Sequence, residues 1–143
     1  MIQIQKLRGC FTRDQLNLLI DTHIVVWSLI EPEKISDKAM QLLVSSENEV
    51  WVSSLSVWEM VTKIQIGKMA LEKGFEKEIT RQGFSFLPFE TKHSLKIHDL
   101  PLHHRDPFDR GLIAQAAVEK FKFLTADQTL HSYREEVDLI MAK

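Results

Sequence analysis

Four acidic residues occupy positions from which they could together bind a metal ion. Each lies at the end of an expected strand or in the first turns of an expected helix: they are Asp21, Glu59, Asp109 and Asp127. If the strands are parallel, all four come near one edge of the sheet, where open α/β sheets form their sites. Converging carboxylates repel one another, and a divalent cation relieves that repulsion. Mg²⁺ and Mn²⁺ prefer oxygen ligands, so an acid-only site suits two-metal hydrolysis of phosphodiesters.

Glu59 also has an ordinary structural explanation. Ser56-x-x-Glu59 is a capping-box pattern, and Glu59 can pair with Lys63 one helical turn later. Helical periodicity places Glu59 roughly opposite the apolar face, which consists of Val57, Met60, Val61 and Ile64. Periodicity alone therefore favours a solvated Glu59.

The other three acids have structural explanations of unequal strength. Asp21 can cap the helix that follows it, and Asp127 can be a solvated acid at a helix start. Asp109 lies at the top of an apolar stripe formed by Leu112, Ile113, Ala116 and Ala117. A carboxylate on that face is costly unless it is paired or coordinated. If Asp109 does not bind a metal, the alternative is that it makes a hydrogen bond with Arg110 or with a loop amide.

The elements that must position these acids alternate along the chain. Apolar and β-branched runs predict strands at 17–21, 49–53, 84–87, 121–125 and 137–141. Capping residues and periodicity predict helices at 22–30, 36–46, 56–66, 74–82, 91–98, 106–119 and 126–133. Asp106-Pro107 is the clearest start, with Asp as N-cap and Pro at the first helical position. The alternation predicts an α/β fold with a mostly parallel sheet covered by helices on both faces.

Composition indicates one domain that is confined to the cytoplasm. The chain has 143 residues, 44% of them hydrophobic, with a formal net charge of −2. No stretch is apolar enough for a membrane span or a signal peptide, and the single Cys10 fits a reducing compartment. The charge argues against a protein that coats duplex DNA. Residues 1–16 are a weakly patterned extension to which we assign no function, and the domain is expected at 17–143.

Other chemistries lack their motifs. His98, His103 and His104 are read as solvent-exposed loop residues, because no thiolate or carboxylate spacing nearby completes a zinc motif. There is no G-x-S-x-G elbow, no P-loop and no G-x-G-x-x-G. A phosphotransferase that used Asp21 as nucleophile would have an acid two residues later, where this chain has His23.

Four segments around the acids resemble the PIN-domain family, closest to its VapC-like toxins. They are LLIDTHIVVW (18–27), SVWEM (56–60) with Lys63 and Gly67-Lys68 following, HRDPFDRGLIAQA (104–116) and FLTAD (123–127). The resemblance covers residues 17–141, and the extension at 1–16 is additional to it. It implies a Rossmann-like three-layer α/β/α sandwich, dependence on Mg²⁺ or Mn²⁺, and endonuclease activity on RNA.

The resemblance also implies roles for individual residues. Asp21 and Asp109 would be the main direct metal ligands, and Glu59 and Asp127 would complete the site or hold metal-bound waters. Glu59 would then face an accessible catalytic groove, which reconciles it with its periodicity. Thr125 would support the site, while Asp106 is interpreted mainly as a helix cap.

The resemblance further implies macromolecular partners. VapC-like toxins form homodimers and are held inactive by a VapB-like antitoxin, which supplies the DNA-binding domain, so DNA contact would be indirect. The candidate contacts to RNA phosphates are Lys63, Lys68, Arg105 and Arg110. Transfer, ribosomal and messenger RNA are all open as substrates. The rival hypothesis is a non-catalytic module that keeps the PIN fold and binds RNA or protein without cutting.

Overall fold

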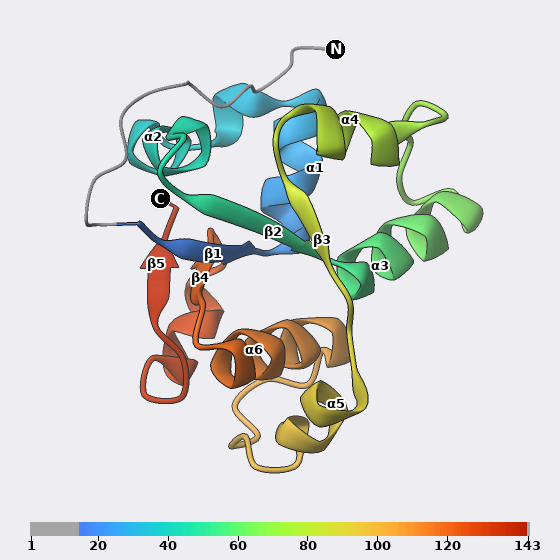
Figure 1. Ribbon diagram of the computed structural model, residues 1–143. Coiled ribbons are helices and arrows are strands. Elements are labelled where there is room, and N and C mark those ends of the chain that lie inside the picture. Colours follow the sequence, from blue (N-terminus) through green and yellow to red (C-terminus); the bar gives the residue numbers. More distant parts are fainter. Residues whose placement is uncertain (1–14, 143) are drawn as a thin grey trace.

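The predicted strands pair into one sheet of five parallel strands in the order β3-β2-β1-β4-β5 (Figure 1). The computed structural model describes residues 15–142. The strands are β1 (Asn17–Ile20), β2 (Glu49–Ser53), β3 (Ser85–Leu87), β4 (Lys122–Thr125) and β5 (Leu139–Met141). Because β1 pairs with both β2 and β4, the ends of these three strands lie side by side, with Ile20 opposite Val52 and Leu124.

Helices cover both faces of the sheet, which confirms the three-layer α/β/α sandwich (Figure 1). The helices are α1 (Thr22–Ile30), η1 (Pro32–Lys34), α2 (Asp37–Val44), α3 (Ser54–Gln65), α4 (Phe75–Arg81), α5 (Thr91–Ile97), α6 (Pro107–Glu119) and η2 (Gln128–Tyr133). Leu18 and Ile20 pack with α1, α2 and α4, whereas Leu19 faces α6 and η2. This alternation along β1 is expected because successive strand side chains point to opposite faces. No helix within residues 15–142 is long and apolar enough to cross a membrane.

The predicted helix caps at Ser36 and Asp106 are confirmed. The Ser36 hydroxyl accepts a hydrogen bond from Ala39 N at 3.2 Å. Asp106 Oδ1 accepts from the N–H groups of Phe108, at 2.8 Å, and Asp109, at 3.1 Å. These bonds satisfy N–H groups that the first helical turn leaves unpaired, and they fix where α6 begins.

Helix α3 differs from its prediction in both its start and its buried face. It begins at Ser54, with Ser53 as the N-cap, so the predicted Ser56–Glu59 capping box is wrong. The Ser56 hydroxyl instead accepts a hydrogen bond from Thr22 Oγ1 at 3.0 Å. Glu59 lies on the buried side, while Val61, assigned to the apolar face, is 48% exposed. The reason is that α3 starts directly at the end of β2 and packs against α1 and α6. The side of α3 that is buried in this way includes the polar residues Ser56 and Glu59.

The other boundaries differ by a few residues. The helix predicted at 126–133 is the 3₁₀ helix η2, which begins at Gln128, and β5 is shorter than expected. The predicted extension at 1–16 lies mostly outside the described residues. Leu16, its last residue, packs against the core, and its carbonyl accepts a hydrogen bond from Glu49 N at 2.9 Å.

Buried His93 is expected to make the stability of the fold depend on pH. Its Nδ1 accepts a hydrogen bond from Glu90 N at 2.9 Å, and burial lowers its pKa despite nearby Glu119. The unfolded chain therefore takes up this proton at a higher pH than the folded protein does. We expect the free energy of unfolding to fall as the pH drops through the ordinary histidine range, near 6.5, toward the lowered folded value.

Chemical denaturation between pH 7.5 and 5 measures this effect. His93→Asn keeps an acceptor near the Nδ1 position and does not titrate, so its stability should vary less with pH than that of the wild type over roughly this range. Equal slopes for the two proteins would contradict the assignment to His93.

Candidate active site

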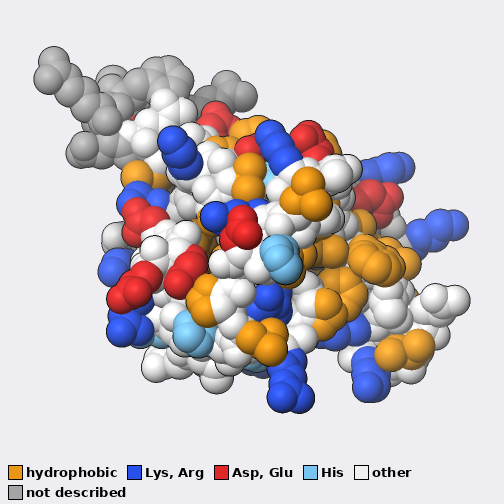
Figure 2. Space-filling model, turned by 90° about the horizontal axis from the view of Figure 1, so that it is seen from below, with side chains coloured by type: hydrophobic (Ala, Val, Ile, Leu, Met, Phe, Trp, Pro, Cys, Tyr) orange, Lys and Arg blue, Asp and Glu red, His pale blue; other side chains and the backbone are white. Residues whose placement is uncertain are grey.

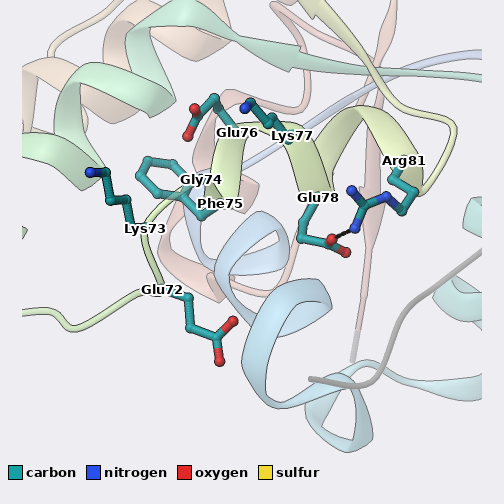
Figure 3. A pocket seen from close by; sticks show the side chains of 8 residues that line it. All are labelled: Glu72, Lys73, Gly74, Phe75, Glu76, Lys77, Glu78 and Arg81. Atoms are coloured by element: carbon teal, nitrogen blue, oxygen red, sulfur yellow. Dashed lines mark ion pairs between the residues drawn. The ribbon is translucent and has the colours of Figure 1, made fainter.

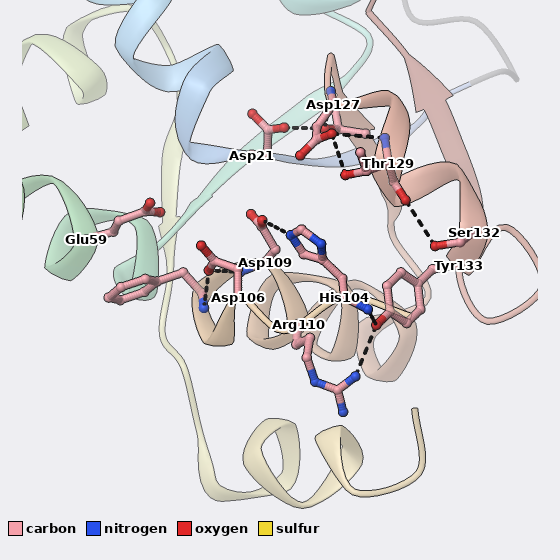
Figure 4. Close-up of polar contacts among 12 residues, drawn as sticks. Asp21, Glu59, His104, Asp106, Asp109, Arg110, Asp127, Thr129, Ser132 and Tyr133 are labelled. Atoms are coloured by element: carbon pink, nitrogen blue, oxygen red, sulfur yellow. Dashed lines mark hydrogen bonds and ion pairs between the residues drawn. The ribbon is translucent and has the colours of Figure 1, made fainter. Parts of the chain in front are cut away.

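The candidate site lies at the carboxyl edge of the sheet, beside the end of β1. From β1 the chain order runs to β2 and β3 on one side and to β4 and β5 on the other, so β1 marks the topological switch point. Ligand sites in open α/β sheets form at this place. Figure 4 shows carboxylates from four separate segments around it.

Asp21 is held by two hydrogen bonds at the end of β1. Its Oδ1 accepts from Ile24 N at 3.0 Å, which makes Asp21 the N-cap of α1, and its Oδ2 accepts from the Thr125 hydroxyl. The side chain is buried, and burial raises the pKa of this carboxyl although the two hydrogen bonds oppose the rise. The capping role and a ligand role are therefore compatible, because each uses particular lone pairs of the same carboxylate.

Thr125 connects Asp21 to Asp127. Its fully buried hydroxyl donates to Asp21 Oδ2 and accepts from Asp127 N at 3.0 Å. Asp127 then caps η2, because its Oδ1 accepts from Thr129 N at 2.9 Å and from Thr129 Oγ1 at 2.6 Å. One hydroxyl thus links the carboxylate of Asp21 to the backbone of Asp127.

Glu59 has one paired and one unpaired carboxylate oxygen. Oε2 accepts from Lys63 Nζ at 2.8 Å, as the spacing of the two residues predicts. Oε1 is buried and has no hydrogen-bond partner among the described residues. The residue is only 5% exposed, and Figure 4 shows its carboxylate pointing toward the space near Asp21 and Asp109. An unpaired buried carboxylate oxygen is costly, so this oxygen is available to bind a cation or a water molecule at this edge of the sheet.

Asp109 pairs with a histidine rather than with Arg110. His104 Nε2 lies 2.9 Å from Asp109 Oδ2. Burial and the neighbouring carboxylate of Asp106 raise the pKa of Asp109 to about 6, although His104 lowers it. The alternative bond to Arg110 is not made, because that guanidinium donates to Pro101 O at 2.9 Å, to the Tyr133 hydroxyl at 3.0 Å and to Ile97 O at 3.1 Å.

His104 is the site residue that the sequence interpretation missed. The sequence predicts a solvent-exposed loop residue, but ligand atoms of His104, Asp109 and Asp127 all lie within 4.8 Å of one another. The signal in the sequence is its position directly before the Arg105-Asp106-Pro107 helix start. That position carries the side chain to the first turn of α6, where Asp109 lies.

The four candidate phosphate contacts have different environments. Lys63 forms an ion pair with Glu59. Arg110 donates hydrogen bonds to the backbone carbonyls of Pro101 and Ile97. Lys68 and Arg105 are exposed. The face seen in Figure 2 carries acidic, basic and hydrophobic side chains side by side rather than a continuous basic surface. The geometry thus favours Lys68 and Arg105 over Arg110 for contact with a polyanion.

A cavity of about 440 Å³ beside α4 is separate from these acids (Figure 3). Its charged lining residues are Glu72, Lys73, Glu76, Lys77, Glu78 and Arg81. Acidic and basic groups alternate there, and Glu78 is paired with Arg81. This balance gives the cavity no preference for an anion or a cation, so the sheet edge is the stronger candidate site.

Comparison with known proteins agrees with this fold. VapBC2 from Rickettsia felis, bound to a DNA fragment from its promoter, has a chain that superposes with a TM-score of 0.68 at 13% identity, covering 90% of this chain and 100% of that one. For DNA-bound VapBC from Salmonella typhimurium the TM-score is 0.64 at 10% identity, with 90% and 99% covered. For FitAcB from Neisseria gonorrhoeae it is 0.55 at 13% identity, with 86% and 96% covered.

These identities establish a shared fold and no more. No curated protein matches the sequence. The family model of the PIN domain matches residues 18–136, a span that contains every acid of the candidate site. Since the match extends over most of the chain, this protein belongs to the PIN domain family.

Proposed function

We propose that this protein is a metal-dependent endoribonuclease and the toxin of a VapBC-type toxin–antitoxin pair. The observation that carries the proposal is the buried, unpaired Oε1 of Glu59, which points toward the space that Asp21 and Asp109 also border. Burial raises the pKa of both Asp21 and Asp109, so the protein on its own disfavours the charged forms of these two carboxylates. Such a donor set fits a divalent cation.

The donors suggest how a cation would be held. Asp21 and Asp109 would be the direct ligands, with Glu59 and Asp127 completing the site. Bound Mg²⁺ or Mn²⁺ would supply Lewis-acid polarisation of a phosphate oxygen and a lowered pKa for a water molecule. Thr125 orients Asp21, and Lys63 partly neutralises Glu59. Lys68 and Arg105 are exposed and would contact RNA phosphates, while Arg110 holds the loop that contains His104.

Metal-dependent cleavage tests the proposal directly. We expect purified protein to cut a mixed RNA pool in Mg²⁺ or Mn²⁺ and to stop cutting in EDTA. DNA of the same sequence is the matched control substrate. RNA that is bound but not cut, with binding unchanged by EDTA, would instead favour the non-catalytic binding module.

A VapB-like antitoxin is the proposed protein partner. The similar structures from Rickettsia felis and Salmonella typhimurium are VapBC assemblies. On this chain, Trp58 and Val61 of α3 are exposed, and so is Ile66, the C-cap of that helix. Trp58 contacts Phe108 edge to face, with ring centroids 5.4 Å apart. We propose this apolar strip as the surface that an antitoxin segment covers, since exposed apolar side chains next to a site mark interaction surfaces. A homodimer is part of the same proposal, and light scattering tests it.

Expression in bacteria tests the toxin role. We expect the unaccompanied wild-type protein to arrest growth, because uncontrolled cleavage of RNA stops translation. An equally expressed Glu59→Gln variant, which removes the charge at the site, should permit growth. Normal growth of cells that contain soluble, folded wild-type protein would contradict the toxin assignment.

A further inference from the structure

The backbone of His104 is fixed by contacts that extend well beyond the loop between α5 and α6. Its N–H donates to the hydroxyl of Tyr133 at 3.0 Å. Tyr133 is fully buried, and its hydroxyl also accepts from Arg110 Nη1 at 3.0 Å. Arg110 in turn donates to Pro101 O and Ile97 O, so the start and the middle of the loop are tied to α6 and η2. This frame holds the position of His104 before any ligand arrives.

The side chain of His104 lies among the acids of the site. Its Nε2 is 2.9 Å from Asp109 Oδ2, and ligand atoms of His104, Asp109 and Asp127 lie within 4.8 Å of one another (Figure 4). Adjacent ligands in octahedral coordination with bonds of 2.0–2.1 Å are about 2.9 Å apart, so the observed spacing suits two ligands of one ion as well as a hydrogen bond. The unpaired Glu59 Oε1 is an independent sign that this space takes a cation.

We propose that His104 is a nitrogen ligand of the cation at this site and gives it a preference for first-row transition ions over Mg²⁺. This inference rests on the metal dependence in the proposed function. Mg²⁺ is a hard ion that takes oxygen ligands and water, whereas imidazole is a good ligand for transition ions. Because the remaining donors are carboxylates, Mn²⁺ is the transition ion best matched to the mixed set, and it is our probe.

The competing role for His104 is to orient Asp109 through their hydrogen bond alone. Residues that orient metal ligands commonly affect affinity about 10–100-fold without touching the metal. His104→Gln separates the two roles, because the Gln amide N–H can donate from near the Nε2 position but is a poor ligand. An orienting role predicts that the variant keeps the ratio of Mn²⁺ to Mg²⁺ affinity. A ligand role predicts that this ratio falls.

Metal binding to the full chain, measured by calorimetry without RNA, tests the inference. We expect wild-type protein to bind Mn²⁺ at least about tenfold more tightly than Mg²⁺, and His104→Gln to lose most of that difference mainly through weaker Mn²⁺ binding. Pulsed EPR of the Mn²⁺-loaded protein should show coupling to a ¹⁴N nucleus. That coupling should disappear in His104→Gln and persist in His103→Gln, a matched change at the exposed neighbouring histidine.

Two other outcomes would overturn the ligand role of His104. Equal losses for the two ions, or an absence of ¹⁴N coupling in a protein that binds Mn²⁺, would overturn the ligand role and leave the proposed function standing. A wild-type protein that binds neither ion would overturn the proposed metal dependence and this inference with it. The melting temperature of metal-free His104→Gln, compared with that of metal-free wild type, shows whether the variant is folded.

Discussion

Asp109→Asn is expected to lower RNA cleavage by about 10³-fold or more without loosening the fold. A bound metal ion contributes several kcal/mol to charge stabilisation in the transition state, and loss of a ligand weakens that contribution. Each 1.36 kcal/mol is a factor of ten in rate. Burial raises the pKa of Asp109 to about 6, so the folded protein disfavours its charge. Asparagine keeps the shape and removes that charge, so the melting temperature at pH 7 should stay the same or rise. Cleavage rates and thermal unfolding of the same preparations measure both effects.

Asp106→Asn is the matched control for this substitution. Asp106 is exposed three residues earlier, and its Oδ1 caps α6, a role that asparagine fills equally well. We expect this variant to cleave RNA like the wild type. If Asp109→Asn kept full activity, Asp109 would be removed from the site. If both variants lost activity, loss of local negative charge would be the cause rather than loss of a ligand.

Thr125→Val should have the second largest effect. Valine matches threonine in shape but leaves Asp21 Oδ2 without its hydroxyl donor and Asp127 N without its acceptor. Leaving a buried group unpaired costs about 1–3 kcal/mol, so thermal stability should fall. Because Thr125 orients a proposed metal ligand, we also expect about a 10–100-fold loss of metal affinity.

Thr125→Ser separates the hydroxyl from the methyl group. Serine retains the hydroxyl, so it should restore metal affinity to within a few-fold of the wild type while leaving a small cavity. Isothermal titration with Mn²⁺ measures affinity without relying on catalysis. Equal metal affinity in the valine variant and the wild type would show that Asp21 is positioned by its Ile24 bond alone.

Local patterns in the sequence were enough to predict the strands and most helix starts. Ser36 and Asp106 cap their helices through hydrogen bonds to residues two or three positions away, which a reader of the sequence can recognise. The parallel sheet followed from the alternation of elements. Asp21, Glu59, Asp109 and Asp127 stay predictions as site residues, and their placement at one edge of the sheet agrees with the reasoning that selected them.

The missed features depend on contacts between distant parts of the chain. The start of α3 and the burial of Glu59 are set by packing against α1 and α6, including a hydrogen bond between Thr22 and Ser56, which are 34 residues apart. Arg110 is bonded to Tyr133, 23 residues away, rather than to its neighbour Asp109. His104 lies near Asp127 only because the loop and η2 meet at the same edge. Helical periodicity carries no information about such contacts.

The bond between Thr125 and Asp21 spans 104 residues and has a consequence for synthesis of the protein on the ribosome. A nascent chain can form β1, β2 and their helices early, but β4 pairs with β1 only after residue 125 has left the exit tunnel. Until then Asp21 lacks its hydroxyl donor, and Asp127 has not reached the site. Under the proposed function, an unfinished toxin is therefore harmless to the messenger and ribosome that are making it. Under that proposal, cutting activity would arise only after Asp127 has emerged, the stage at which an antitoxin could capture the toxin.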